Sequence, residues 1–129
     1  MLGNPAAVAD ALAQLQEMND GARSELAAGR PRSAGTLAIA GAVRAVDLIC
    51  YSALGEHSVA ASHSVAIDLL ASVPGADNAV ENFSLCQTRK SDYNYHVSDI
   101  DDNEVASVIE AAERLSEEAR DRLIDKGWI

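Results

Sequence analysis

Aromatic residues, cysteines and histidines are scarce in this sequence. Among its 129 residues, only 4% are aromatic, two are Cys and three are His, although hydrophobic residues make up 48%. Alanine fills most of the difference, and alanine has the highest helix propensity of all residues. The Val and Ile residues occur mainly as single positions within stretches of helical period, so no alternating run predicts a strand. The composition therefore favours an all-α protein whose helices approach closely through small side chains.

The low cysteine and histidine content excludes several kinds of site. No CxxC, CxxH or HExxH spacing occurs, so the sequence predicts no zinc site and no cofactor. A glycine-rich phosphate loop and a GxSxG nucleophile turn are also missing. Cys50 and Cys86 each lie in an apolar helical context. We expect buried, reduced thiols, with a disulfide between them as the alternative.

Basic residues are few. Ten Lys and Arg stand against twenty Asp and Glu, which gives a formal net charge of −10. Residues 1–97 hold ten acids and six bases, whereas residues 98–129 hold ten acids and four bases. A general nucleic-acid binder usually carries a basic face, so this balance argues against that class. The acidic C-terminal end is most simply a solvated surface.

No targeting signal or membrane span is evident. The N-terminal stretch lacks a basic region and carries Asp10 early, unlike a signal peptide. The longest apolar stretch, Thr36–Val43, is followed by Arg44 and Asp47. It is therefore shorter than the roughly 20 residues that a span needs. We expect a cytoplasmic protein with no membrane contact.

Helical periodicity predicts one domain over residues 1–129, an antiparallel bundle of four to five helices. The first helix starts at Asn4-Pro5 and ends near Gly29, and the second is capped by Ser33 and ends at Gly55. A short third helix covers residues 65–70, a polar loop covers 76–80, and a fourth helix covers 81–95. A capping box of Asp101 and Glu104 starts the last helix. The apolar end Trp128-Ile129 is expected to dock on the bundle or on a second protomer.

The segment from Arg89 to His96 is the strongest candidate for a functional site. Seven residues turn a helix by about 700°, so Arg89 and His96 share one face if the helix continues unbroken. An Arg can hold a phosphate and a His can transfer protons near neutral pH, a pairing suited to phosphodiester cleavage. Lys90 adds a second cation, and Tyr93 and Tyr95 add phenols and stacking surface. Alternatively, Arg89 pairs with Asp92 or Asp99, Tyr93 packs into the core, and His96 is an exposed residue at the helix end.

At these residues the sequence resembles the HEPN superfamily of helical bundles. Three stretches carry the likeness, within a HEPN-like core of about residues 34–125: Ala45–Ile49, His63–Leu70, and Arg89–Tyr93 followed by the helix around Ala111–Leu115. The resemblance implies an all-α fold and, commonly, a homodimer. Many members are metal-independent endoribonucleases of toxin–antitoxin, antiphage and RNA-processing systems, with an Arg followed after four to six residues by a His. Carried over, Arg89 would bind the scissile phosphate and His96 would act in acid–base transfer, with both protomers contributing to one site.

Other features of the same segment favour a role in binding. Lys90 follows the Arg where active members often have Asn, Asp or His, and Ser98 stands where some active members have a Tyr. Members with an Arg/Lys-x-x-Asp-Tyr stretch like Arg89–Tyr93 and no catalytic His serve as binding or partner modules. Three interpretations follow: a non-catalytic module for a partner protein or a nucleotide, with a nucleotidyltransferase-like antitoxin as one form of partner; an RNA-cleaving homodimer; and an unrelated structural or interaction bundle.

Overall fold

The protein is an all-α bundle. The computed structural model describes residues 5–55, 63–95 and 100–129, and within these ranges it contains helices and no strands. The elements in chain order are α1 (Pro5–Ala27), α2 (Pro31–Leu54), α3 (His63–Ala71), α4 (Asp77–Tyr95) and α5 (Asp102–Asp125). The predicted fold class is therefore confirmed, and each expected helix is present.

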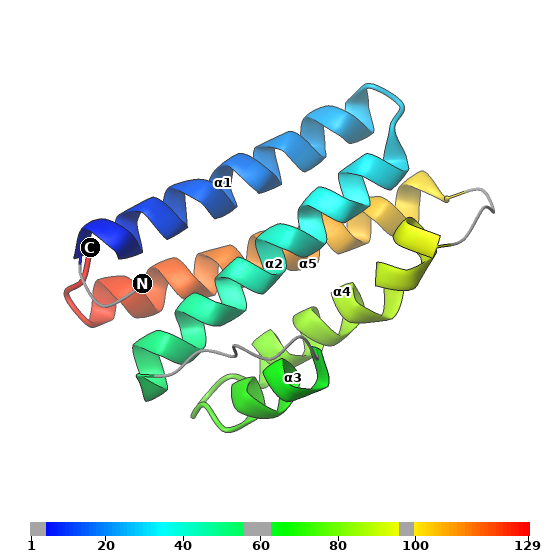
Figure 1. Cartoon of the computed structure of the whole chain (residues 1–129). Helices are drawn as coiled ribbons and strands as arrows, with labels where there is room; N and C mark the ends of the chain where they lie inside the picture. Colours follow the sequence, from blue (N-terminus) through cyan, green and yellow to red (C-terminus); the bar gives the residue numbers. More distant parts are fainter. Residues whose placement is uncertain (1–4, 56–62, 96–99) are drawn as a thin grey trace.

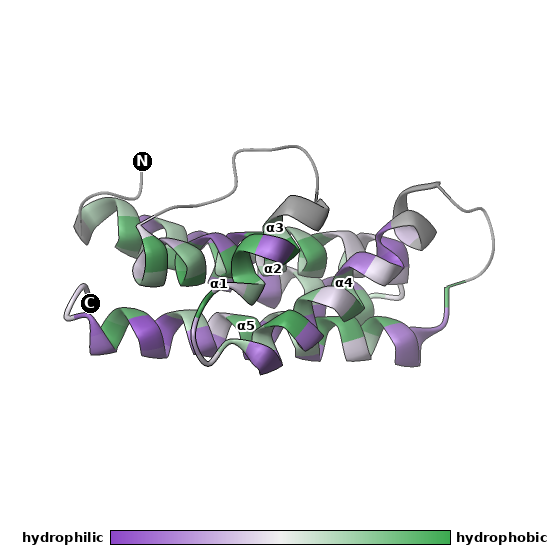
Figure 2. Ribbon diagram, turned by 90° about the horizontal axis from the view of Figure 1, so that it is seen from below, coloured by the Kyte–Doolittle hydropathy of each residue, from purple (hydrophilic) through white to green (hydrophobic). Residues whose placement is uncertain are grey.

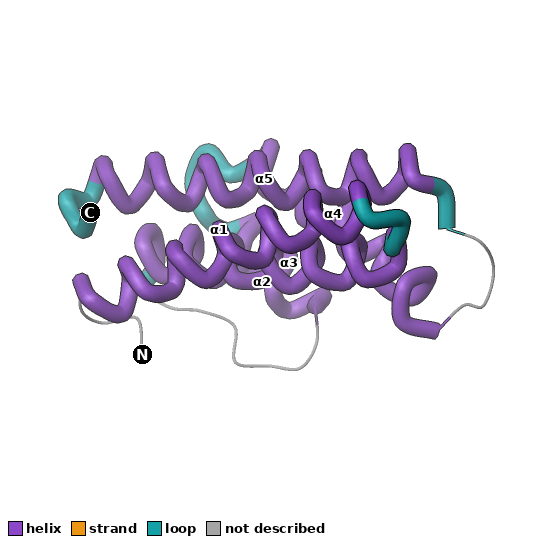
Figure 3. The backbone as a smooth tube through the Cα atoms, turned by 90° about the horizontal axis from the view of Figure 1, so that it is seen from above, coloured by secondary structure: helices purple, strands orange, loops and turns teal. Residues whose placement is uncertain are grey.

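Helix α2 lies at the centre of the bundle. It contacts α1, α3, α4 and α5, and Figure 1 shows α1 and α4 on its two sides with α5 behind it. Consecutive long helices run antiparallel, whereas α2 and α5 run in the same direction (Figure 1). Figure 3, turned by 90°, places α5 on one side of the bundle and α1 and α2 on the other. This arrangement leaves one long side of α2 facing away from α5.

Small residues allow α2 to pack against so many neighbours. Its buried positions include two glycines and four alanines among twelve residues: Ala34, Gly35, Ala38, Ile39, Gly41, Ala42, Ala45, Val46, Leu48, Ile49, Cys50 and Ser52. At Gly41, an added Cβ would lie 2.8 Å from Oδ1 of the buried Asn19 on α1. The Asn19 side chain in turn donates from Nδ2 to Oγ of Ser116 on α5, at 2.7 Å. One small position on α2 thus admits a polar link between α1 and α5.

A second close contact joins the start of α2 to the end of α4. The Tyr93 side chain is 2% exposed, as expected for a core residue. Its ring lies against Gly35, where an added Cβ would be 2.4 Å from the ring atom Cε2. Arg32, one turn earlier on α2, donates from Nη1 to the Tyr93 carbonyl at 2.9 Å. That carbonyl belongs to the last turn of α4, where a cation is favoured by the helix dipole.

The helix ends agree with the sequence in part. Gly55 ends α2 in the left-handed conformation (φ 71°) and donates to the Tyr51 carbonyl, as predicted. The predicted cap at Ser33 is wrong: α2 begins with Pro31 at its first turn, a position where the missing N–H costs nothing. The predicted loop over residues 76–80 is also wrong, because α4 begins at Asp77. An acid in the first turn suits the positive end of the helix dipole there.

The start of α5 forms half of the predicted capping box. Asp101 is the cap, and its side chain accepts from the Asn103 amide at 2.9 Å. Glu104 is directed elsewhere, with Oε1 2.8 Å from Nη1 of Arg89 on α4. At the far end, the Trp128 ring lies 5.7 Å from the Tyr51 ring, centroid to centroid. Trp128 therefore docks on α2 of its own bundle.

The apolar character of α2 follows from its place in the bundle. By length and composition alone, Pro31–Leu54 is a candidate membrane span, although the sequence predicted none. More than half of its apolar window is buried inside the bundle, as in the core helix of a soluble protein. In Figure 2, hydrophilic residues recur along the whole of α5, whereas α2 is mostly hydrophobic. The hydropathy of α2 is thus explained by its central position.

Replacing Gly35 by Ala tests the contact with Tyr93. In most helices Gly→Ala raises stability by about 0.5–1 kcal/mol, but here the new Cβ would displace the Tyr93 ring. We expect the free energy of unfolding, measured by urea denaturation, to fall by about 1–3 kcal/mol. Gly21→Ala on α1 is the matched control, since its Cβ would meet only the flexible Leu37 Cδ1, at 3.3 Å. The interpretation fails if both substitutions change stability equally, or if Gly35→Ala costs as much in a Tyr93→Leu background.

The two cysteines are free and buried, which confirms the expectation of reduced thiols. Burial raises the pKa of Cys50 to about 11 and that of Cys86 to about 12. A raised pKa removes the reactive thiolate at neutral pH. We therefore expect almost no labelling by a disulfide reagent at about pH 8 in the native protein, and two labelled thiols per chain in denaturant. Fast native labelling of either thiol would contradict the buried placement.

Candidate functional site

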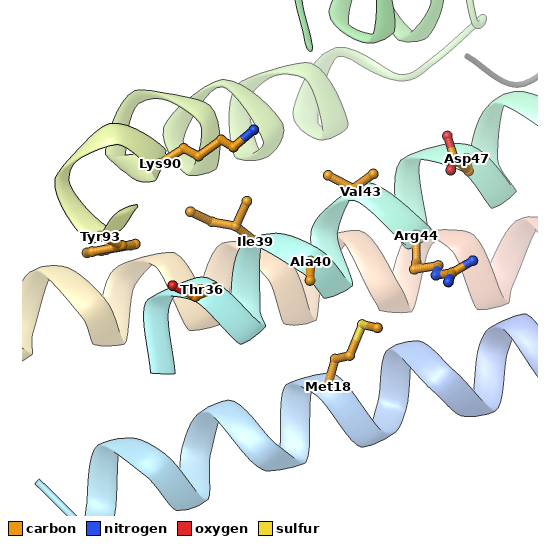
Figure 4. Close-up of a pocket in the computed structure, with 9 residues that line it drawn as sticks. All are labelled: Met18, Thr36, Ile39, Ala40, Val43, Arg44, Asp47, Lys90 and Tyr93. Carbon is orange, nitrogen blue, oxygen red and sulfur yellow. The ribbon is translucent and has the colours of Figure 1, made fainter. Parts of the chain in front are cut away.

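A groove of about 430 Å³ runs along the open side of α2 (Figure 4). Its floor is one face of α2, its first wall is α1 and its second wall is α4 (Figure 4). The lining residues are Met18, Thr36, Ile39, Ala40, Val43, Arg44, Asp47, Lys90 and Tyr93. The floor positions follow the spacing i, i+3, i+4, i+7, i+8, i+11, so they form a single stripe of the helix. Their span of eleven residues corresponds to a length of about 16 Å.

The middle of the groove is apolar. Ile39 and Val43 point from α2 toward α4, Ala40 adds a small side chain between the walls, and Met18 faces the floor from α1 (Figure 4). Val43 and Met18 are only partly buried, so they still present apolar surface to the groove. A Met side chain is flexible and adapts to ligands of different shape. These residues can bury an apolar partner of moderate size.

Charged side chains stand around this apolar centre. Lys90 extends over it from α4, while Arg44 and Asp47 come from α2 (Figure 4). The groove therefore carries two cations and one anion, within a chain whose net charge is −10.

The predicted site segment is divided between two surfaces. Lys90 and Tyr93 line the groove, whereas Arg89 is directed toward α5, where it pairs with Glu104. Consecutive residues on a helix are about 100° apart, and here Arg89 faces Glu104 whereas Lys90 faces the groove. Helix α4 ends at Tyr95, whose side chain is outside the described part of the structure, as is the whole of His96.

The structure gives Arg89 a partner on α5 that was not among those predicted from the sequence, while Asp99 and the side chain of Asp92 lie outside the described residues. The sequence pointed to Asp92 or Asp99, close in the chain, and the structure places Arg89 Nη1 2.8 Å from Oε1 of Glu104, fifteen positions away on α5. Both side chains are 38% exposed, so the pair remains accessible to water. A phosphate binding at Arg89 would have to compete with this carboxylate.

Most of the groove was missed from the sequence. Met18, Arg44 and Asp47 lie far from the Arg89–His96 segment in the chain, and only the fold brings them beside Lys90. One signal was present. Alanines at positions 34, 38, 42 and 45 form one helical stripe of α2, and a second apolar stripe passes through Ile39 and Val43. A helix with two apolar stripes has more apolar surface than one neighbour can cover.

A second hollow, of about 410 Å³, lies between α1 and α5 and is more polar. Glu113, Glu117 and Arg120 contribute to its lining, together with Gln16 and Asn19. It is bordered by an ion pair in which Nη2 and Nε of Arg23 donate to the Glu113 carboxylate, at 2.7 and 3.2 Å. Across residues 5–55, 63–95 and 100–129, no group of three or more His, Cys, Asp or Glu side chains is placed to hold a metal ion.

Comparisons with models of known protein families, with curated proteins and with solved structures found no match. The fold and the groove are therefore described from this chain alone, and the resemblance to the HEPN superfamily stays a prediction.

A double-mutant cycle tests the pair of Arg89 and Glu104. We expect Glu104→Gln and Arg89→Met each to lower the free energy of unfolding by up to about 1 kcal/mol, as for other exposed ion pairs. The double variant should cost less than the sum of the single variants, because each removes the same interaction. Urea denaturation at low and high salt provides the measurement. Strict additivity would contradict the pairing.

Proposed function

We propose that this chain is a HEPN-like, non-catalytic binding module that receives a partner protein in the groove along α2. The groove itself carries the proposal: it combines an apolar centre with charged residues at its edges, the usual composition of a specific binding surface. Its length, several turns of α2, suits an extended or helical segment of a protein.

The position of Arg89 supports binding over RNA cleavage. In a phosphodiesterase, an Arg stabilises the charge that develops on the phosphate. Here the Arg89 guanidinium is held by the Glu104 carboxylate, which a phosphate would have to displace. Lys90, the next residue, belongs to the groove on a different side of α4. The groove brings Lys90 together with apolar residues of α1 and α2 in one surface.

The acidic surface also supports a protein partner over RNA. The chain carries twice as many acids as bases, and eight of those acids lie on α5. RNA binding depends largely on cations that neutralise phosphates. The proposal includes the remaining implications of the resemblance: a cytoplasmic protein, a homodimer, and a toxin–antitoxin or defence system in which a nucleotidyltransferase-like antitoxin is one form of partner.

The proposal predicts capture without cleavage. The purified chain should leave RNA intact in the presence of EDTA, and it should retain a specific protein when exposed to extract of its own cells. Val43→Glu places a charge in the apolar centre of the groove and should abolish that capture. Arg114→Glu, on the exposed side of α5, is the control and should leave it unchanged.

Two outcomes would overturn the proposal. RNA cleavage that is lost in Arg89→Ala and His96→Ala, with folding intact, would establish the alternative, an endoribonuclease that uses this pair across a homodimer. Capture that is equally strong with wild type, Val43→Glu and Arg114→Glu would show that the groove is not the binding surface.

A further inference from the structure

Helix α1 forms one wall of the groove and lies at the edge of the bundle, where α2 and α5 are its neighbours among the described helices. We propose that α1 is a movable wall: it separates from α2 and α5 as one unit, turning about Arg30, and thereby widens the groove. Three observations support this motion: hollows on both sides of α1, a buried polar centre, and few large apolar contacts. The inference concerns the bundle itself and holds whichever partner enters the groove.

Hollows lie on both sides of α1, near the middle of the helix. On one side, the groove of about 430 Å³ passes Met18, which faces its floor in Figure 4. On the other side, the hollow of about 410 Å³ between α1 and α5 is lined from α1 by Leu12, Leu15, Gln16 and Asn19. A side chain beside a hollow has fewer close neighbours, so it gains less from dispersion contacts. The middle of α1 is therefore held less firmly than a helix that is enclosed on both flanks.

The buried stripe of α1 is polar at its centre. Asn19 is 3% exposed, and its Nδ2 donates to Oγ of Ser116 on α5 at 2.7 Å. Within the described part of the chain, no group donates a hydrogen bond to Oδ1 of Asn19, which lies against Gly41 on α2. A buried acceptor without a donor is costly, and the cost is removed when the helix moves away and water reaches the amide. The centre of α1 thus favours separation more than an apolar contact would.

Few large apolar side chains hold α1 on the bundle. Its buried residues form one stripe with helical spacing, in which Val8 and Leu15 are the large apolar members beside two alanines and Asn19. An exposed ion pair of Arg23 with Glu113 on α5 adds little stability. Helix α5, by contrast, contributes five of the largest fully buried side chains: Val105, Val108, Ile109, Leu115 and Leu123. Because hydrophobic stabilisation follows the apolar area buried, α1 separates at a lower cost than α5 does.

The turn between α1 and α2 provides the hinge. The Arg30 amide donates to the Glu25 carbonyl at 2.9 Å, and the two side chains form an ion pair, so this part of the turn is bonded to α1. The Arg30 carbonyl accepts from the Ala34 amide at 3.0 Å, which bonds the following part to α2. Rotation about the two backbone torsions of Arg30 therefore changes the angle between the helices while both sets of bonds are kept. A residue at the end of an element is a usual position for such a hinge.

Native-state hydrogen exchange, followed residue by residue by NMR at low urea concentrations, tests the proposal. We expect the hydrogen-bonded amides of α1 to exchange as one group, at least about tenfold faster than the most protected amides of α2 and α5. The exchange of α1 should depend only weakly on urea, because its opening exposes less surface than the unfolding of the whole chain.

Variants distinguish the opening of α1 from global unfolding. Arg23→Met breaks the ion pair with α5 and should speed the exchange of α1 by up to about fivefold. Gly41→Ala places a Cβ against Asn19 Oδ1 and should speed it by about tenfold. Phe83→Leu is the control, since Phe83 is fully buried on α4, and α4 and α1 do not contact each other within the described ranges. It should speed the slowest amides of α2 and α5 by at least about threefold and leave α1 unchanged.

Three results would overturn the inference. Equal protection of α1, α2 and α5 would show that α1 separates only when the whole chain unfolds. The same conclusion would follow if Phe83→Leu accelerated α1 as much as α2. Exchange rates that fall steadily from Pro5 toward Ala27, with no common value, would show fraying of the helix end in place of the opening of a unit. Capture of a partner protein, which tests the proposed function, depends on none of these three results.

Discussion

The contact between Tyr93 and Gly35 determines how α4 lies on α2, and the groove depends on it. The ring fits against α2 only because position 35 has no Cβ. Arg32 holds the same residue from the other end through the Tyr93 carbonyl. Gly35 thus contacts the side chain of Tyr93, and Arg32, three residues earlier on α2, holds its backbone. Since Lys90 is one turn before Tyr93, this contact also sets the height of the α4 wall over Ile39 and Val43.

The central position of α2 explains both the core and the groove. A helix that is apolar on nearly all sides needs neighbours on nearly all sides. Helices α1, α4 and α5 cover most of α2, with α3 near its end, and they leave the groove as its uncovered side within the described residues. The same apolar composition gives α2 the length and hydropathy of a candidate membrane span. Burial in the bundle therefore explains most of the apolar surface of α2, and the rest of that surface faces the groove.

The sequence predicted features that depend on local spacing, and it failed where distant residues decide. Periodicity identified the helices, because it follows from the pattern of one helix; the burial of Tyr93 agrees with the alternative in which this residue packs into the core. Ser33 is a good cap by type, but Pro31 two residues earlier already has the backbone of a first turn. Glu104 fits a capping box by spacing, yet Arg89 on another helix takes its carboxylate. The groove requires residues from three helices, so the two apolar stripes of α2 could indicate an uncovered side but not the residues of α1 and α4 that complete it.

The division of the Arg89–Tyr93 stretch bears on what such a segment can do. In the sequence, Arg89, Lys90 and Tyr93 lie within five residues of one another, as the residues of one catalytic site could. On a helix it sends Arg89 to α5 and Lys90 to α2, because neighbouring residues diverge by about 100°. Cleavage of RNA would require Arg89 to leave Glu104 and a second protomer to complete the site. The proposed binding of a partner requires only the surface that α1, α2 and α4 already form, and this difference in what must be rearranged is the reason why we propose binding rather than cleavage.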